Sequence, residues 1–181
     1  MPAATASAVP TDAVEQMQYL TFQLAGEEYA IGILRVREII EYDVVTTVPT
    51  APPHIRGVIN LRGSVVPVVD LAVKFGLPAT TVTKRTCIVI VEAELDGDRT
   101  VMGVIADAVS QVVDLPPGDI EPPPSFGTRV RVEHLVGLGR MGRKFALILD
   151  IDRLLSAREL VAAADMAATD ADAAHSAAAA A

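Results

Sequence analysis

The sequence has no tryptophan, one cysteine and few aromatic residues, and each shortage excludes a class of protein. A single thiol, Cys87, builds neither a disulfide framework nor a cysteine-rich metal site. Cys87 stands in the apolar run RTCIVIV with no histidine near it in sequence, so we interpret it as a small buried side chain. Because aromatic residues make up only 4%, valine, isoleucine and leucine must fill the interior, which favours β structure.

Positive charge is also scarce, since 15 Lys and Arg stand against 23 Asp and Glu and give a net charge of −8. This balance opposes binding to nucleic-acid phosphates and to anionic lipid. No run reaches the roughly 18 apolar residues that cross a bilayer. No Lys or Arg precedes Arg35, so the basic start of a signal peptide is missing. We therefore expect a cytoplasmic protein that binds no nucleic acid and does not insert into a membrane.

Motifs for catalysis and for cofactors are missing as well. The histidines, His54, His134 and His175, lie far apart and have no partner at metal-ligand spacing. GLGRMG at 137–142 matches a dinucleotide fingerprint, but the strand-like RKFALIL follows it where a helix is required. No nucleophile elbow occurs and no pair of carboxylates is singled out by its spacing. The sequence thus predicts no enzyme activity, no metal and no cofactor.

Short apolar segments separated by turns fill the middle of the chain. Residues 1–17 and 159–181 are rich in alanine and read as flexible tails around a folded part, 18–158. We expect LRVREI to form a helical turn and DVVTTVP to form a strand. GVINLRGSVVPVV is typical of a hairpin with Gly63-Ser64 at its turn, and Asp70 then caps a short helix.

Two segments of the sequence resemble each other, which indicates a repeated structural unit. GVINLRGSVVPVVD begins at Gly57 and GLGRMGRKFALILD begins at Gly137, an offset of 80 residues (from 57 to 137). Each contains a glycine, a turn, an apolar strand and a capping aspartate. Short strands at this spacing favour two small barrels, with a boundary near residues 80–86. A chance likeness between two hairpins is the alternative.

The run GVINLRG carries two polar side chains in an apolar setting. Alternation along a strand places Ile59 and Leu61 on one side, and Val58, Asn60 and Arg62 on the other. If Ile59 and Leu61 face the core, the other three residues form an outward strip. An arginine beside aliphatic residues on a rigid hairpin suits an interface, and an arginine in plain solvent is the alternative.

Four stretches in this order resemble the CheW family of chemotaxis coupling proteins: LTFQLAGEEYAIGILRVREII, IRGVINLRGSVVPVVDLAVKFGL, VMGVIADAVSQVVDLPPGDI and GLGRMGRKFALILDIDRLL. The resemblance covers about residues 19–156, and INLRGSVVPVVDL is its most diagnostic part. It implies a mainly β fold of two SH3-like five-stranded barrels packed together, with short helices. It also implies a non-enzymatic scaffold that couples the hairpin tips of methyl-accepting chemoreceptors to the regulatory domain of a CheA-type histidine kinase. Such a two-component adaptor is recruited to receptor arrays at the inner membrane, with other CheW copies as further ring partners.

The resemblance also implies which residues meet each partner. The receptor-binding set carried over to this chain is Ile33, Val36, Glu38, Ile39, Val58, Asn60 and Arg62. The kinase-binding set is Arg56, Glu121, Ser125 and Phe126. Two positions depart from the family, because Glu121 stands where a basic residue is often found and Ser125 where an acid is.

Two other functions stay open at this point. One is an adaptor of a non-flagellar chemosensory-like pathway, which the sequence does not separate from chemotaxis. The other is a small barrel that binds nucleic acid, which predicts a basic stripe and is opposed by the acidic balance.

Overall fold

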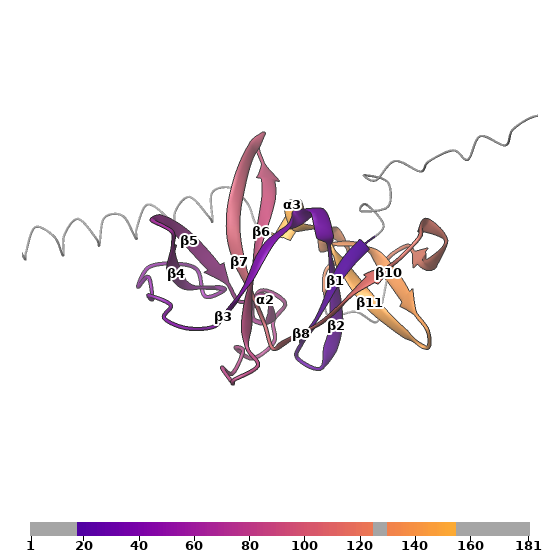
Figure 1. The fold of residues 1–181 in the computed structure, drawn as a ribbon, viewed down its shortest axis with the longest axis horizontal. Coiled ribbons are helices and arrows are strands. Elements are labelled where there is room, and N and C mark those ends of the chain that lie inside the picture. The colour runs from indigo at the N-terminus through magenta and orange to yellow at the C-terminus, as the bar shows by residue number, and fades with distance from the viewer. Residues whose placement is uncertain (1–17, 125–129, 155–181) are drawn as a thin grey trace, which may run out of the picture.

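The computed structural model describes residues 18–124 and 130–154 (Figure 1). The strands of these residues are β1 (Gln18–Leu24), β2 (Glu27–Gly32), β3 (Val36–Glu41), β4 (Ile55–Leu61), β5 (Ser64–Val69), β6 (Cys87–Leu95), β7 (Asp98–Ala106), β8 (Ala108–Asp114), β9 (Ile120–Glu121), β10 (Leu135–Met141) and β11 (Lys144–Leu149). The helical elements are single turns: η1 (Ile33–Arg35), α2 (Leu71–Lys74), η2 (Pro117–Asp119), η3 (Val132–His134) and α3 (Ile151–Leu154). The two expected tails lie outside the described residues, as do Ser125 and Phe126.

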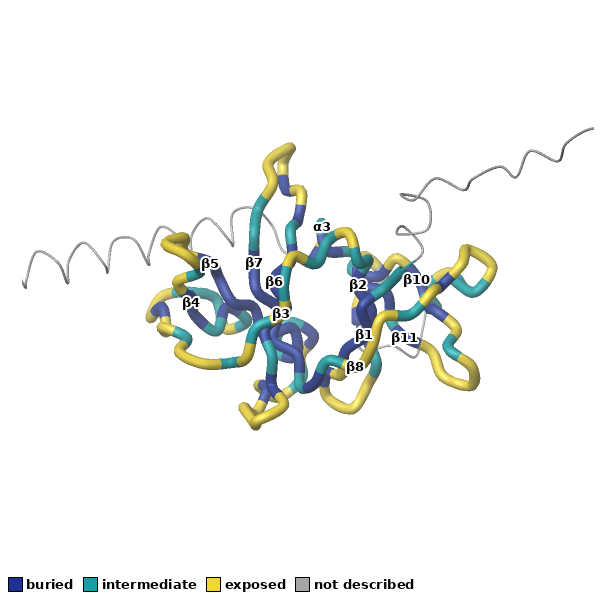
Figure 2. The backbone as a smooth tube through the Cα atoms, viewed as in Figure 1, coloured by how far each residue is buried: buried dark blue, intermediate teal, exposed yellow. Residues whose placement is uncertain are grey.

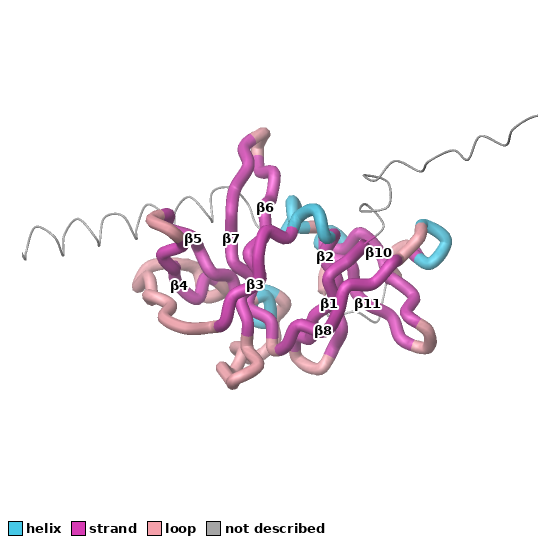
Figure 3. Tube along the Cα trace, viewed as in Figure 1, coloured by secondary structure: helices cyan, strands magenta, loops and turns pink. Residues whose placement is uncertain are grey.

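The strands form two curled sheets, which confirms the predicted mainly β fold of two small SH3-like barrels (Figure 3). One sheet has the order β8-β1-β2-β11-β10-β9, and the other has the order β3-β6-β7-β5-β4. Neighbouring strands are antiparallel, except that β11 pairs with β2 and β5 pairs with β7 in parallel. Each parallel pair joins the second strand of a hairpin to a strand outside that hairpin.

The barrels do not divide at residues 80–86 as predicted. Strands β5 and β6, which flank that segment, lie in the same five-stranded sheet. The six-stranded sheet takes β1 and β2 from before β3 and takes β8 to β11 from after β7. The echo between two hairpins located the repeated units, but the parallel pairing that assigns β1 and β2 to the later barrel leaves no local signal in the sequence.

The similarity between the two hairpin segments corresponds to a structural repeat. The hairpin β4–β5 leads into α2, and the hairpin β10–β11 leads into α3. The backbone N–H of Asp70 donates to the carbonyl of His54 at 2.8 Å, and that of Asp150 donates to the carbonyl of His134 at 2.9 Å. Both aspartates also accept a hydrogen bond from the backbone N–H two residues on, at 3.1 and 3.2 Å, which confirms Asp70 as the cap of a short helix.

The largest core lies between the two barrels (Figure 2). Strand β6 shows how it forms, because Val89 and Val91 face this shared core while Ile88 and Ile90 face the interior of their own barrel. The strand is therefore apolar on both faces, as the run CIVIV requires. The interior of the other barrel is smaller and centres on Leu115 and Ile148.

Three local expectations need correction. Of LRVREI only Leu34 and Arg35 are helical, as the end of η1 (Ile33–Arg35), and the rest belongs to strand β3 (Val36–Glu41). DVVTTVP is not a strand, because among its residues Thr46 alone pairs, in an isolated bridge to Val58. The turn of the hairpin β4–β5 lies at residues 62–63, one position earlier than predicted.

Gly57 is placed where no side chain fits. Its φ is +155°, and a β-carbon built there would lie 2.1 Å from the backbone oxygen of Thr46. Gly57→Ala should therefore lower the free energy of unfolding by about 1–3 kcal/mol, the usual cost of forcing extra atoms into a packed site. Urea denaturation followed by circular dichroism measures this. Gly32→Ala is the control, since Gly32 has ordinary backbone angles and open space around it; similar stability losses in both variants would contradict the prediction.

Candidate functional site

Arg62 occupies the turn of the hairpin β4–β5 in a left-handed conformation. Its φ is +53° and that of Gly63 is +87°, as in a two-residue hairpin turn of the type that fits the twist of the strands. The side-chain oxygen of Asn60 accepts a hydrogen bond from the backbone N–H of Gly63 at 2.9 Å. Asn60 therefore shapes the turn that presents Arg62.

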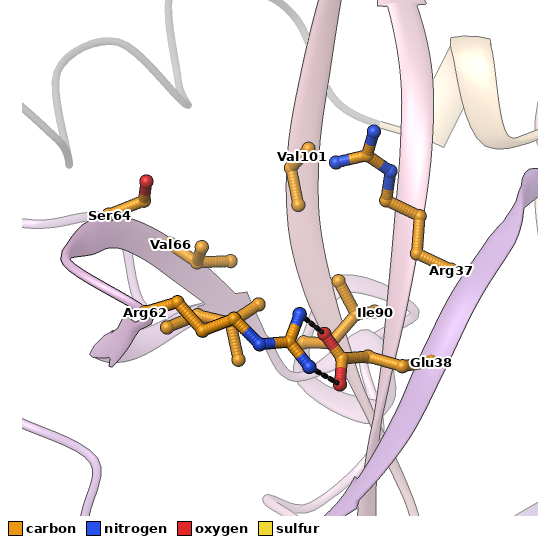
Figure 4. Close-up of a pocket in the computed structure, with 8 residues that line it drawn as sticks. Arg37, Glu38, Arg62, Ser64, Val66, Ile90 and Val101 are labelled. Carbon is orange, nitrogen blue, oxygen red and sulfur yellow. Dashed lines mark hydrogen bonds and ion pairs between the residues drawn. The ribbon is translucent and has the colours of Figure 1, made fainter.

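The guanidinium of Arg62 forms a bidentate ion pair with the carboxylate of Glu38 (Figure 4). Its Nη1 lies 3.0 Å from Oε1 and its Nη2 lies 3.1 Å from Oε2. Glu38 belongs to β3 and Arg62 follows β4, the two outer strands of the five-stranded sheet, so the ion pair joins the two edges of this sheet. The side chain of Arg62 is 79% exposed and that of Glu38 is 26% exposed. An ion pair this exposed contributes only about 0–1 kcal/mol to stability.

A groove of about 600 Å³ opens beside this ion pair. Its walls come from β3, from the hairpin β4–β5 and from β6 and β7 (Figure 4). The apolar side chains that line it are Leu61, Val66, Ile90 and Val101. Arg37 and Ser64 add polar groups, and Arg37 also pairs with Glu92 at 2.9 Å. The site therefore combines an apolar surface with fixed charges of both signs, the usual composition of a protein interface.

A second groove, of about 750 Å³, lies along β3 and β4. Ile40 and Tyr42 line it from the end of β3, and Ile59 and Asn60 line it from β4. Val44, at its border, is 77% exposed. The gap between β3 and β4 is thus accessible on more than one side of the Glu38–Arg62 pair.

The structure brings together some of the expected receptor-binding residues and separates others. Glu38, Asn60 and Arg62 lie around the two grooves. Ile33 and Val36 are half-buried against the core between the barrels. Ile39 is 42% exposed and pairs with Val89, so its side chain lies on the face of β3 that is turned toward this shared core.

Val58 contradicts the predicted outward strip, because it is only 8% exposed. Its backbone also pairs with that of Thr46, in an isolated bridge on the free edge of β4. Ile59 faces its barrel interior as predicted, and Leu61, which is half-buried, packs against the same interior and also lines the groove. Alternation therefore ordered the side chains correctly, but it could not reveal the burial of Val58 or the bridge between Val58 and Thr46.

Arg56, expected on the kinase side, lies in a mostly buried polar network. Its Nη2 donates to the carbonyl of Thr80 and lies 3.6 Å from Oδ2 of Asp70, which is 1% exposed. The Asp70 carboxylate also accepts hydrogen bonds from the backbone N–H of Ala72 and from the N–H and hydroxyl of Thr80, at 2.9–3.1 Å. The contacts of the Arg56 guanidinium are thus made inside the fold, where they tie the segment after α2 to the hairpin β4–β5.

Glu121, the other described residue expected on the kinase side, is half-buried on β9, and its carboxylate contacts the guanidinium of Arg140. Sequence reasoning missed Arg140 and also Arg37. Arg37 directly precedes Glu38, which was a usable signal. Arg140 comes 19 residues after Glu121 and meets it only because β9 pairs with β10.

The described parts of the chain contain neither a candidate metal-ligand cluster nor a candidate membrane-spanning helix. Residues 18–124 and 130–154 contain no cluster of three or more histidine, cysteine, aspartate or glutamate side chains that could hold a metal ion. In the same residues, no helix has the length and apolar character needed to cross a membrane.

Comparisons with known proteins agree on one family. The family model described as "CheW-like domain" matches residues 18–159. A chemotaxis protein CheW from Klebsiella aerogenes is 39% identical over 157 residues, which cover 87% of this chain and 92% of that protein. One from Treponema pallidum is 32% identical and covers 81% and 86%. The crystal structure of the scaffolding protein TtCheW from Thermoanaerobacter tengcongensis superposes with a TM-score of 0.71 at 32% identity, over 80% of this chain and 90% of that one.

The two arginines of the NLRG-containing run should differ in their effect on stability. Arg56→Ala leaves the buried Asp70 carboxylate and the Thr80 carbonyl short of a donor, so the free energy of unfolding should fall by about 1–3 kcal/mol. Arg62→Ala removes only an exposed pair and should change it by at most about 1 kcal/mol. Urea titration of both variants beside the wild type measures the difference. Equal losses would show that the network around Asp70 does not stabilise the fold.

Proposed function

The chain belongs to the CheW-like domain family of chemotaxis scaffold and adaptor proteins, and from this membership we propose that it couples chemoreceptor tips to a CheA-type histidine kinase. It does so without chemistry of its own, in the cytoplasm, at receptor arrays beneath the inner membrane. The observation that carries the proposal is the Glu38–Arg62 pair, fixed on a rigid hairpin at the border of an apolar groove.

The groove suits one face of a receptor helix. A helix presents apolar side chains at positions i, i+3, i+4 and i+7, and Leu61, Val66, Ile90 and Val101 offer them an apolar surface. Glu38 and Arg62 would contact polar groups beside that stripe. Because the exposed pair contributes little to folding, a partner group can replace either member at small cost.

A second face, around Glu121 on β9, meets the regulatory domain of the kinase. Strands β9 and β10 lie at the other end of the molecule from the hairpin β4–β5 (Figure 1). Two partners can therefore bind at once, each to its own barrel. Coupling then follows from geometry, since the shared core between the barrels fixes one partner relative to the other.

Reversing the charge of Arg62 tests the receptor-facing site. Arg62→Glu places two carboxylates together at residues 38 and 62, so the partner that contacts Arg62 should bind about tenfold more weakly or worse. Binding of a purified receptor cytoplasmic fragment and of the full-length kinase, both from the source organism, is measured by calorimetry. The circular dichroism spectrum should stay that of the wild type.

Arg99→Glu is the matched control for this experiment. Arg99 is 83% exposed and faces Glu92, which is 22% exposed, at 3.5 Å, so it has nearly the same setting on a different hairpin. It should bind both partners like the wild type. If Arg62→Glu also binds both partners normally, Arg62 is an ordinary surface residue. If the wild-type protein retains no CheA-type kinase when it is purified from its source cells with both proteins expressed, the coupling role itself is wrong.

A further inference from the structure

Phe145 on β11 is exposed to an unusual degree. It is 46% exposed, whereas the other phenylalanines among the described residues, Phe22 and Phe75, are 0% and 9% exposed. A large aromatic ring left half in water loses the free energy that burial would provide. In a chain with so few aromatic residues, its position on the surface indicates a contact with another molecule.

Phe145 lies at the exposed end of an apolar strip on the hairpin β10–β11, on the face of β11 whose Leu147 packs against the core between the barrels. It pairs across the strands with Arg140, and the next pair on the same face is Leu138 with Leu147, both half-buried. Val136, where the register of β10 shifts, is 51% exposed. The strip therefore offers a partner a protruding ring with aliphatic neighbours behind it.

The rim of this strip is positively charged, although the chain is acidic overall. Arg143 and Lys144 are exposed at the tip of the hairpin, and the Arg140 side chain is 53% exposed. A net charge of −8 makes such a cluster stand out, and it favours a partner with carboxylates. Arginine and aromatic residues together are the types enriched in the few positions that dominate binding energy.

Arg140 also connects this strip to Glu121. The Glu121 carboxylate, on the neighbouring strand β9, contacts the Arg140 guanidinium. This contact makes the Phe145 strip continuous with the face on which Glu121 lies.

Resting on the function proposed above, we propose that Phe145 and Arg140 are the anchors of the kinase-docking face. Phe145 enters an apolar pocket of the regulatory domain of the kinase, and the cationic rim meets carboxylates around that pocket. The receptor is not the partner here, because the Glu38–Arg62 groove lies on the other barrel (Figure 1).

The test uses the full chain and the purified full-length CheA-type kinase of the source organism. Phe145→Ser should weaken the dissociation constant for the kinase at least about tenfold, as the loss of an aromatic anchor does. Val65→Ser is the matched control: Val65 occupies the corresponding second position of β5 and is 48% exposed. It should change kinase affinity less than about twofold, in the range of the many near-neutral surface contacts. Phe145→Ser should keep the urea midpoint of the wild type and its affinity for the receptor fragment.

A second variant tests the charge without touching the ring. Lys144→Glu should weaken kinase binding and flatten its dependence on salt, because screening then has less attraction to remove. If the wild type binds neither partner, the proposed function fails. If it binds the kinase and both variants bind equally well, only the docking assignment fails. If Phe145→Ser instead alters self-association in sedimentation and leaves kinase affinity unchanged, the strip is a contact between copies and the assignment is likewise overturned.

Discussion

The apolar core between the two barrels is the constraint on which the other features depend. Among the described residues it gathers 22 buried side chains, whereas the interiors of the two barrels hold six and four. With each buried aliphatic side chain worth about 1.5–3 kcal/mol, interiors of that size would not offset the entropy of ordering a barrel alone. The barrels therefore stabilise each other. The positions of the hairpins β4–β5 and β10–β11, and of the ion pairs on them, follow from this one packing arrangement.

The exposed ion pairs have the opposite energetic character. Glu38–Arg62 and Glu121–Arg140 each involve a strand at the edge of a sheet, and each is open to water. Their small contribution to stability leaves the charged groups available to partners. Asp70 differs, since its buried carboxylate is held by three hydrogen bonds and by Arg56. Pairs of a carboxylate and an arginine thus stabilise the fold where they are buried and remain available for recognition where they are exposed.

Local signals in the sequence were sufficient for the hairpins, for the capping aspartates and for rejecting GLGRMG as a nucleotide site. These local signals did not predict contacts between segments that are distant in the sequence. Alternation placed Val58 outward because no local pattern predicts its bridge to Thr46. The predicted division at residues 80–86 was wrong because parallel strand pairing has no local sequence pattern. The family resemblance singled out Glu38 and Arg62 as receptor-binding residues, and the folded sheet brings the two side chains into an ion pair. The sequence did not indicate a role for Arg140, because its partner Glu121 becomes its neighbour only in the folded sheet.

The route of the chain through the six-stranded sheet has a consequence for synthesis. Strands β1 and β2 leave the ribosome first, yet the parallel neighbour of β2 is β11, which follows the entire five-stranded sheet. The earlier hairpin must wait with Phe22, Leu24 and Tyr29 uncovered while the intervening barrel is made. This barrel can therefore be completed only after β8 to β11 have been made, and until then the exposed apolar side chains of the first hairpin favour aggregation.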